Sequence, residues 1–506
     1  MFLRNHPLLV AALAGAATVL GFAPFEWFAL PVATLALLIA LWRSAASARA
    51  AALCGFAFGL GCFAAGVSWV YVSMHDFGGM PAWLAVALTL LLCAYLALFP
   101  ALTGWAYRAL DGKSSFVTLA ALPALWTLTE WLRGWLFTGF PWLELGYSQV
   151  PVSPLAGYIP IIGVYGATFL TVASAALLCI GVTLAFDRRS ALTLVDRPWL
   201  LALVVLWAGG FALKNIEWTT PLGEPVSVAL IQGNISQDMK WREDRLQATL
   251  DTYYDLVAAS DARLTVLPET ALPLFLHSVP RSYLEGLAAH ARKVNGDILL
   301  GVPERGAARS YFNSVLSLGS APEQFYRKSH LVPFGEFIPL KPLFGWFLDF
   351  AQIPLADFAR GDEAQQPLEV AGQKVAVNIC YEDAFGAEIA RQLPQATLLV
   401  NVSNVAWFGR SIAPQQHLQI SQARALETGR VMLRATNTGM TAIIDPQGRV
   451  QAAAPEFTAA VVRGTVQGYA GATPYVRWND RPVLLGALLL VAGAWWMRRR
   501  RPTISK

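Results

Sequence analysis

The sequence has few charged residues for its length. Aspartate, glutamate, lysine and arginine together make up 14% of the 506 residues, against about 25% in a typical soluble protein. Hydrophobic residues make up 55%, and the mean hydropathy is +0.46. So few polar side chains cannot coat a wholly water-exposed chain, and part of the protein is therefore expected to lie in lipid. This composition excludes a disordered protein, a disulfide-rich secreted module and an enzyme exposed to water throughout.

Cysteine is also scarce, and its five positions are unevenly spread. Four of the cysteines fall in apolar stretches, where a thiol usually acts as a small apolar side chain. Cys380 is the one cysteine of the more polar region, so that region cannot form an internal disulfide. No cysteine and histidine residues are spaced for a metal, and no glycine-rich phosphate loop is evident. We therefore expect no cofactor.

The net charge is small and gives no sign of a nucleic-acid partner. It amounts to +5, from 38 basic and 33 acidic residues. The excess does not gather in a groove-like basic patch, which a nucleic-acid-binding surface would need.

Eight apolar stretches are candidate membrane spans, although the first two are short for full crossings. They are Leu8–Phe22, Trp27–Trp42, Ala51–Val72, Ala82–Tyr107, Phe116–Phe137, Ile161–Phe186, Trp199–Leu213 and Pro482–Met497. If each one crosses the membrane, lysine and arginine gather in the loops on one side, whereas the loops near Pro24, Gly78 and Pro151 carry none. This asymmetry obeys the positive-inside rule. It predicts eight spans with both termini cytoplasmic, rather than a re-entrant hairpin or a cleaved signal peptide at the N-terminus.

The region between the seventh and eighth stretches predicts a soluble α/β domain on the outer side of the membrane. Strands are expected at Val226–Gln232, Leu264–Leu267, Ile298–Val302, Lys374–Ile379, Thr397–Val402 and Thr441–Ile444. Helices are expected at Trp241–Ala259, Arg281–Val294, Phe385–Gln392 and His417–Arg430. The predicted organisation is a seven-helix bundle over residues 1–214, a periplasmic domain over 218–478, an eighth helix over 482–497 and a basic cytoplasmic tail over 498–506.

Three residues of this region form a candidate catalytic set. Cys380 follows a predicted strand and precedes a helix, a position that exposes a nucleophile near backbone N–H groups. Glu269 follows a strand and a proline and could act as a general base, and Lys328 could stabilise an oxyanion. Each residue also has an ordinary interpretation: a buried thiol, a turn carboxylate and a solvated surface lysine. Together they supply nucleophile, base and electrophile.

Glutamate, lysine and cysteine in this order, at strand ends of an α/β domain, resemble the nitrilase superfamily. Four finer motifs, together with the flanking seven and one apolar stretches, resemble the apolipoprotein N-acyltransferase family of the Gram-negative inner membrane. They are Leu-Pro-Glu269-Thr, Lys328-Ser-His-Leu-Val-Pro-Phe-Gly-Glu336, Cys380-Tyr-Glu382 and Ala435-Thr-Asn-Thr-Gly439. The resemblance covers essentially the whole chain. It departs at Val405, where an aspartate is expected, and this weakens any role for that position.

The resemblance implies a fold of α/β plus membrane α type, in which an αββα nitrilase-like sandwich is inserted into an eight-helix transmembrane domain. It implies that an acyl chain moves from a phospholipid, usually phosphatidylethanolamine, to the α-amine of an apolipoprotein's diacylglyceryl-cysteine. In this scheme Cys380 is the nucleophile, Glu269 the base and Lys328 the oxyanion donor. Supporting residues are Glu336, Tyr381, whose N–H would assist Lys328, and Glu382, with Trp241 near the entrance.

Two other functions are compatible with parts of the sequence. A membrane-tethered amidase of nitrilase type could use the same three residues, but one membrane tether would be enough for it. A transporter or receptor would need ionisable groups inside the membrane, and Glu130 and Arg133 lie one helical turn apart in the fifth stretch. We interpret them as a local structural pair rather than a substrate path.

The segment Phe337–Leu355 is rich in aromatic and aliphatic residues and is interrupted by prolines. It could fold over the domain's own core. We instead expect a lid that dips into the outer leaflet and admits acyl chains, with Leu343, Phe344 and Trp346 as its apolar contacts and Gly345 as a hinge.

Overall fold

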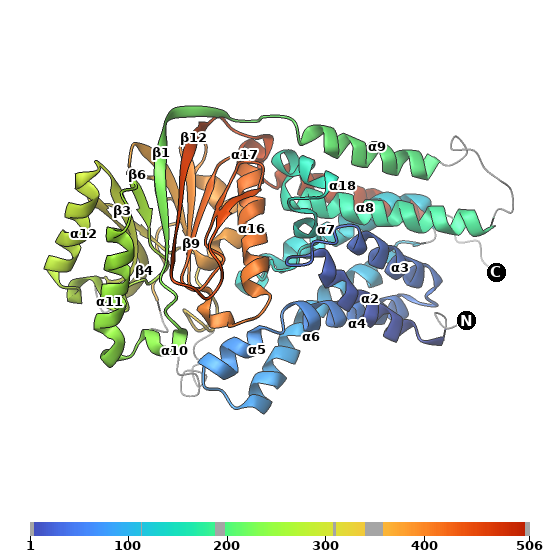
Figure 1. Cartoon of the computed structure of the whole chain (residues 1–506). Helices are drawn as coiled ribbons and strands as arrows, with labels where there is room; N and C mark the ends of the chain where they lie inside the picture. Colours follow the sequence, from blue (N-terminus) through green and yellow to red (C-terminus); the bar gives the residue numbers. More distant parts are fainter. Residues whose placement is uncertain (1–4, 113, 188–197, 307–309, 340–357, 501–506) are drawn as a thin grey trace. The chain divides into compact units, whose positions relative to one another are not determined.

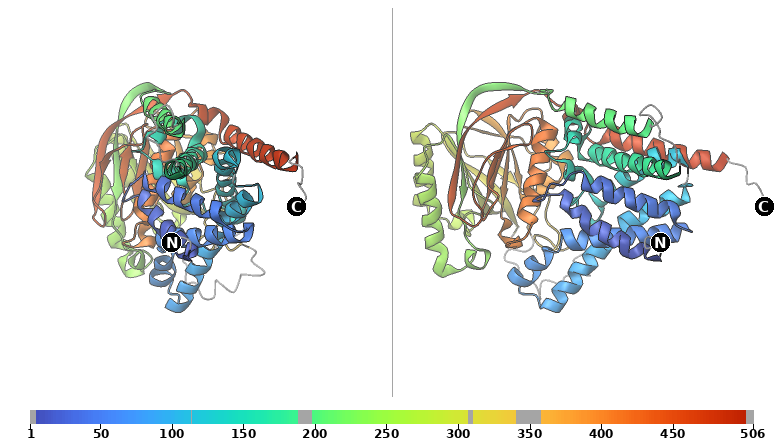
Figure 2. Two further views of the ribbon diagram at one scale, coloured as in Figure 1. Left: turned by 90° about the vertical axis from the view of Figure 1, so that its right-hand side faces the viewer. Right: turned by 45° about the vertical axis from the view of Figure 1, so that its right-hand side comes forward.

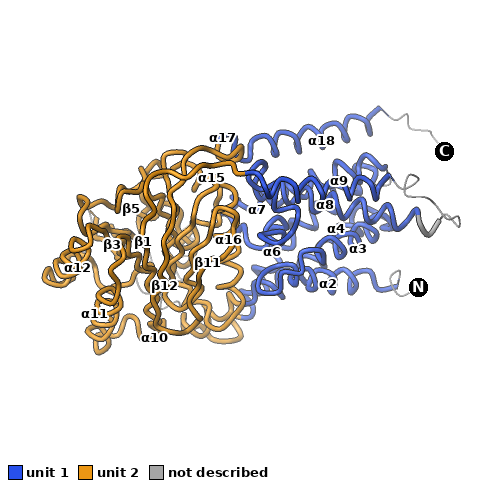
Figure 3. The backbone as a smooth tube through the Cα atoms, turned by 45° about the horizontal axis from the view of Figure 1, so that its top comes forward, with its two compact units in different colours: residues 1–68, 86–216, 477–506 blue, residues 69–85, 217–476 orange. Residues whose placement is uncertain are grey.

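The computed structural model describes residues 5–112, 114–187, 198–306, 310–339 and 358–500. Contacts divide the chain into two compact units (Figure 3). Unit 1 comprises residues 1–68, 86–216 and 477–506 and is helical, whereas unit 2 comprises residues 69–85 and 217–476 and holds both sheets. Residues 69–85, which run from the end of the third apolar stretch to the start of the fourth, thus belong with the α/β unit.

Unit 1 consists of apolar helices. They are α2 (Pro7–Thr18), α3 (Leu30–Ser44), α4 (Ala48–Gly66), α6 (Ala82–Ala109, whose first turn lies in unit 2), α7 (Leu122–Arg133), α8 (Ile159–Asp187), α9 (Pro198–Leu213) and α18 (Arg481–Arg500). By length and composition, 48–66, 82–109 and 154–184 could cross a membrane, and 7–21, 30–44 and 198–213 are shorter apolar helices. These helices fit a membrane protein. The predicted eight crossings remain a prediction.

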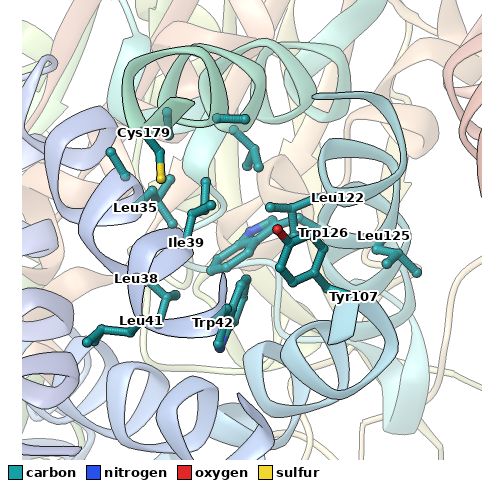
Figure 4. Close-up of a cluster of buried hydrophobic side chains, with 14 of the residues drawn as sticks. Leu35, Leu38, Ile39, Leu41, Trp42, Tyr107, Leu122, Leu125, Trp126 and Cys179 are labelled. Carbon is teal, nitrogen blue, oxygen red and sulfur yellow. The ribbon is translucent and has the colours of Figure 1, made fainter. Parts of the chain in front are cut away.

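A cluster of large apolar side chains holds unit 1 together (Figure 4). Within it the Trp42 ring lies 6.0 Å from that of Tyr107 and 6.1 Å from that of Trp126, measured between ring centroids. Its indole N–H donates to the carbonyl of Ala51 at 2.9 Å, so that the buried polar atom is satisfied. Cys179 packs in the same cluster, and all four cysteines of the apolar stretches are buried and unbonded, as the sequence predicted.

Glu130 and Arg133 of α7 form a local structural pair, as predicted. Arg133 Nη2 lies 4.0 Å from Glu130 Oε1, and both side chains are buried. Glu130 also accepts hydrogen bonds from Trp126 and Thr168 and from the backbone N–H of Leu145. These bonds tie α7 to α8 and to the loop between them.

Unit 2 contains two six-stranded sheets. The first has the order β12 (Ala460–Ala470), β1 (Thr220–Gln232), β2 (Leu264–Val266), β3 (Asp297–Arg305), β4 (Tyr311–Gly319) and β5 (Phe325–Arg327). The second has the order β11 (Val450–Ala453), β10 (Ala442–Ile444), β9 (Met432–Thr436), β8 (Leu398–Ser403), β7 (Gln373–Ile379) and β6 (Leu368–Val370). In each sheet three central strands are parallel, and the strands toward the edges are antiparallel.

The two sheets pack face to face because alternate residues of their strands are apolar. Val375, Val377 and Ile379 of β7 belong to the core between the sheets, whereas Ala376 belongs to the core on the outer face. The outer face of the first sheet is covered by α11 (Glu243–Ala258) and α12 (Arg281–Lys293), and that of the second by α16 (Ala413–Thr428). Figures 1 and 2 show these layers. The predicted αββα sandwich is therefore present.

Several predicted bounds were wrong or incomplete. The helix expected from Trp241 begins at Glu243, after the short helix α10 (Gln237–Lys240). The helix expected over 385–392 is a single turn, α15 (Gly386–Ile389), followed by a 3₁₀ turn, and a short helix α17 (Pro474–Trp478) ends the unit. The sequence did not predict β4, β5, β6, β9, β11 or β12. The segment Asp445–Gly448 forms the turn that joins the antiparallel strands β10 and β11.

Residues 69–85 pack within unit 2 against the 3₁₀ turn Val405–Phe408 that follows β8. This segment includes the short helix α5 (Val70–Val72). Ser73 Oγ donates to the carbonyl of Trp407 at 2.7 Å, and the Trp69 ring lies 4.7 Å from that of Phe408. A segment from the N-terminal half of the chain is thereby fixed to the loop that follows β8.

Candidate active site

Cys380 lies at a sharp turn at the end of β7. Its φ is +55°, a value that a non-glycine residue adopts only where the surrounding structure enforces it. A 3₁₀ turn, Cys380–Ala384, begins at this residue. The amide of Asn401 in the neighbouring strand β8 donates to the carbonyl of Cys380 at 3.2 Å. The strand-to-helix turn predicted for the candidate nucleophile is confirmed.

Glu269 lies beyond the end of β2 and is buried. Its Oε1 accepts from the side-chain amide of Asn313 at 2.7 Å, and its Oε2 accepts from the backbone N–H of Asn404 at 2.8 Å. Gly301 of β3 makes this approach possible, because a Cβ there would overlap the carbonyl of Pro268. The carboxylate is therefore held by both sheets, since Asn404 directly follows β8.

Lys328 follows β5 and is 1% exposed. Two antiparallel pairings separate β5 from β3, so β5 runs in the same direction as β2 and β3 and ends at the same edge of the sheet. Lys328 Nζ lies 2.8 Å from Glu336 Oε1 and 3.5 Å from Glu269 Oε1. The interpretation as a solvated surface lysine is wrong, and the structure brings Lys328, Glu269 and Glu336 together.

The charges of the site define its resting protonation state. Burial opposes charge on Lys328, but Glu336 and Glu269 outweigh it, so the pKa of the ammonium lies above its usual value. Burial likewise opposes charge on Glu269, but Lys328 and Asn313 outweigh it and lower the pKa of the carboxyl. Burial and the Glu269 carboxylate raise the pKa of the Cys380 thiol. The free site thus holds a thiol, a carboxylate and an ammonium.

Glu382 links the strand of the lysine to the strand of the cysteine. Its Oε1 accepts from the backbone N–H groups of Ser329 and His330, at 2.7 and 3.0 Å. Its Oε2 accepts from Tyr326 Oη at 3.0 Å and from the backbone N–H of Ile379 at 2.7 Å. The supporting position predicted for Glu382 therefore has a physical basis: its carboxylate fixes the residues after β5 against the end of β7.

A second buried network lies directly behind the nucleophile. His417 Nε2 is 2.7 Å from Asp383 Oδ1 and 3.2 Å from the carbonyl of Cys380. Arg434 Nη1 donates to Asp383 Oδ2 at 3.2 Å, and Ser421 Oγ donates to the same oxygen. Burial opposes charge on Asp383, but His417 and Arg434 outweigh it and lower the pKa of the carboxyl. The network fixes the backbone of the turn that carries the cysteine.

The other residues singled out from the sequence differ in how the structure places them. Tyr381 is buried next to the cysteine, and its ring lies 5.1 Å from that of Phe385. Trp241 is half-buried between α10 and α11. Val405 is buried and apolar, so it offers the site no polar group. The predicted lid residues Leu343, Phe344 and Trp346 lie outside the described residues.

Three polar residues of the site were missed by sequence reasoning. Asn313 donates to both Glu269 and Glu336, and the backbone of Asn404 holds Glu269. Lys240 is 3% exposed, and its Nζ donates to the backbone carbonyl of Glu269. Only Lys240 had a signal in the sequence, as the neighbour of Trp241. In the described ranges, no group of three or more histidine, cysteine, aspartate or glutamate side chains is placed to hold a metal ion.

The α/β unit, with the cysteine turn at the end of β7, has a domain of the carbon–nitrogen hydrolase type. The family model of the carbon-nitrogen hydrolase matches residues 227–475, and that of the apolipoprotein N-acyltransferase N-terminal domain matches residues 14–177. The apolipoprotein N-acyltransferase of Nitrosomonas europaea is 56% identical over 98% of this chain and 99% of its own length. That of Chromobacterium violaceum is 48% identical over 97% of this chain and 94% of its own length. Among solved structures, the carbon-nitrogen hydrolase of Helicobacter pylori G27 is 16% identical, with a TM-score of 0.37, over 55% of this chain and 95% of that one.

The chain belongs to the apolipoprotein N-acyltransferase family. The family predicted from the sequence motifs is therefore confirmed, and an acyltransferase is favoured over an amidase and over a transporter.

Proposed function

We propose that this protein transfers an acyl chain from a membrane phospholipid to the α-amine of the diacylglyceryl-cysteine of apolipoproteins, through a thioester on Cys380. The observation that carries the proposal is the buried pair of Glu269 and Lys328, 3.5 Å apart, together with the strained turn that presents Cys380. The names of the relatives supply the acceptor class. Phosphatidylethanolamine is the proposed donor.

In the first step Glu269 takes the proton of the Cys380 thiol as the sulfur attacks the ester carbonyl. The oxygen of the tetrahedral adduct becomes negative, and Lys328 stabilises it together with the N–H of Tyr381. The C–O bond of the ester then breaks. Glu269 returns the proton to the leaving oxygen, and a lysophospholipid departs while the acyl group remains on sulfur.

In the second step the amine attacks the thioester, the C–S bond breaks and an amide forms. A thioester in a site from which water is excluded reacts with a delivered amine in preference to water. Transfer through a covalent intermediate predicts ping-pong kinetics. An amidase would instead hand the acyl group to water, so an amine-dependent product separates the two functions.

Intact-mass analysis of the purified protein with phosphatidylethanolamine alone tests the proposal. We expect a mass increase of one acyl group in the wild-type protein and none in Cys380→Ala. Cys380→Ala should retain the wild-type unfolding temperature, because a thiol-to-methyl change leaves the turn intact. Wild-type rates of transfer in Cys380→Ala would overturn the mechanism. Rapid hydrolysis of soluble amides, with no acyl transfer to a lipopeptide, would favour the amidase.

We place both termini in the cytoplasm and the α/β unit in the periplasm, with the helices in the inner membrane. The charge asymmetry of the loops supports this orientation. Alkaline phosphatase, which is active only in the periplasm, provides the test when fused after residue 214 or after residue 506. The first fusion should be active and the second inactive, and the reverse pattern would refute the orientation.

A further inference from the structure

Lys240 is a second buried lysine of the site, with little to compensate its charge. Its side chain is 3% exposed. In the described part of the chain, its Nζ donates one hydrogen bond, to the backbone carbonyl of Glu269 over 3.4 Å, and forms no ion pair. Lys328, by contrast, contacts two carboxylates. Burial with a single long hydrogen bond shifts the equilibrium of this amine toward its neutral form.

The position of Lys240 is fixed through the same residues that hold the base. It ends α10, whose first residue, Gln237, accepts a hydrogen bond from the side-chain amide of Asn404 at 2.9 Å. The backbone N–H of Asn404 in turn holds Glu269. Asn437, from the motif Ala435–Gly439, binds both the N–H and the carbonyl of Ile235, just before α10. Lys240 is therefore built into the site and is not a side chain that happens to be covered.

The groups that act on Lys240 give its amine an intermediate basicity. Burial lowers its pKa to about 8, while Glu269, at the end of β2, and Cys380, at the end of β7, partly oppose this effect. An α-amine has a pKa of about 8. A proton can therefore pass from an α-ammonium to Lys240 at almost no cost in free energy.

The proposed second step releases two protons from the acceptor nitrogen, and Glu269, Lys328 and Cys380 together can accept only one of them. The acceptor enters as an ammonium with three N–H bonds and leaves as an amide with one. One of the two protons goes by way of Glu269 to the Cys380 thiolate released when the C–S bond breaks. The other needs a second base, and Lys328 cannot serve because it is already protonated and paired with Glu336.

We propose that Lys240 is a further catalytic residue, which accepts a proton from the α-ammonium of the acceptor and so delivers a neutral amine to the thioester. This inference rests on the proposed function. The proton moves from the acceptor nitrogen to Lys240 Nζ and then to solvent. The first step, which consumes and returns one proton, does not need Lys240.

The test separates the two steps in Lys240→Met and Lys240→Arg. Methionine removes the base while nearly keeping the shape, and arginine keeps a positive charge that cannot be lost near neutral pH. Lys374→Met, a change at an exposed lysine, is the matched control. Each protein is first loaded with phosphatidylethanolamine and the acyl adduct is followed by mass. A synthetic diacylglyceryl-cysteine peptide is then added, and the loss of the adduct is timed between about pH 6.5 and pH 9.5.

We expect both Lys240 variants to form the acyl adduct within about threefold of the wild-type rate, and to transfer it about 100-fold more slowly at pH 7. The wild-type transfer rate should rise with a midpoint near pH 8, and the deficit of the variants should shrink well above this pH, where the acceptor amine already arrives neutral. Normal transfer in Lys240→Arg would show that only the charge matters and would overturn the inference. Slow adduct formation in both variants would also overturn it, because Lys240 would then serve Glu269 in the first step. A wild-type protein that forms no adduct would refute the proposed function instead, and the inference with it.

Discussion

Lys328 and Glu336 form a short ion pair, with 2.8 Å between Nζ and Oε1, whereas the distance from Lys328 to the carboxylate of Glu269 is 3.5 Å. The charge of Lys328 is thus neutralised mainly by Glu336, and the proposed base, Glu269, is the more distant carboxylate. Glu336 is itself held by the backbone N–H of Val332 at 2.8 Å. Because Glu336 neutralises Lys328, Glu269 can take up a proton while Lys328 stays charged.

Replacing Glu336 should therefore impair the first step. In Glu336→Gln the buried Lys328 loses its nearer carboxylate and turns toward Glu269, which becomes a weaker base. We expect the rate of Cys380 acylation to fall about 10- to 100-fold, measured by mass after mixing with phospholipid. Glu363→Gln, a change at an exposed carboxylate paired with Arg391, is the matched control and should be without effect. Unchanged acylation in Glu336→Gln would contradict this assignment.

Lys328→Arg should be nearly inactive although the charge is kept. The site of Lys328 is 1% exposed and is shaped for one compact donor, and a planar guanidinium is larger and directs its N–H groups differently. We expect a loss of about 100-fold or more in acylation. Lys374→Arg, at an exposed position, provides the comparison. A near-normal rate in Lys328→Arg would mean that the lysine has no part in the chemistry.

The pH dependence of acylation follows from the directions of the pKa shifts. Because the pKa of Glu269 is lowered, the base is charged throughout the neutral range, and because that of Cys380 is raised, the thiol keeps its proton there. The acylation rate should therefore be flat between about pH 6 and pH 8 and fall only in acid, below the usual pKa of a glutamate. Glu269→Gln should abolish adduct formation. A rate that climbs steadily through this range would instead indicate attack by a preformed thiolate.

Glu382→Gln should destabilise unit 2 as well as inactivate it. Its carboxylate accepts from the N–H groups of Ser329, His330 and Ile379, and an amide would turn an N–H₂ group toward some of these donors. We expect the free energy of unfolding to fall by about 2–4 kcal/mol, measured by denaturation of the purified protein. Glu369→Gln, at an exposed side chain of β6, should change it by less than about 0.5 kcal/mol. Equal stability of the two variants would refute the linking role of Glu382.

The sequence alone was sufficient for the parts of this protein that depend on local pattern. The alternation in Lys374–Ile379 predicted β7, and the polar residues that follow it predicted the turn at Cys380. Similarly, the apolar run before Pro268 placed Glu269 at a strand end. These features could be predicted because a strand and the turn after it are specified by neighbouring residues. The motifs around these residues were also enough to identify the family.

The tertiary structure decided which side chains meet. Antiparallel strands such as β4 and β12 were missed because their stability comes from pairing with distant strands rather than from a strong pattern of their own. Lys328 could not be recognised as buried, because the carboxylates that compensate its charge lie 59 and 8 residues away in sequence. Lys240 was missed for a related reason: its hydrogen-bond partner is the backbone of Glu269, 29 residues away beyond β2, and its helix α10 is held by Asn404 beyond β8. Burial of a charge depends on partners supplied by the whole fold, and a local sequence pattern does not contain them.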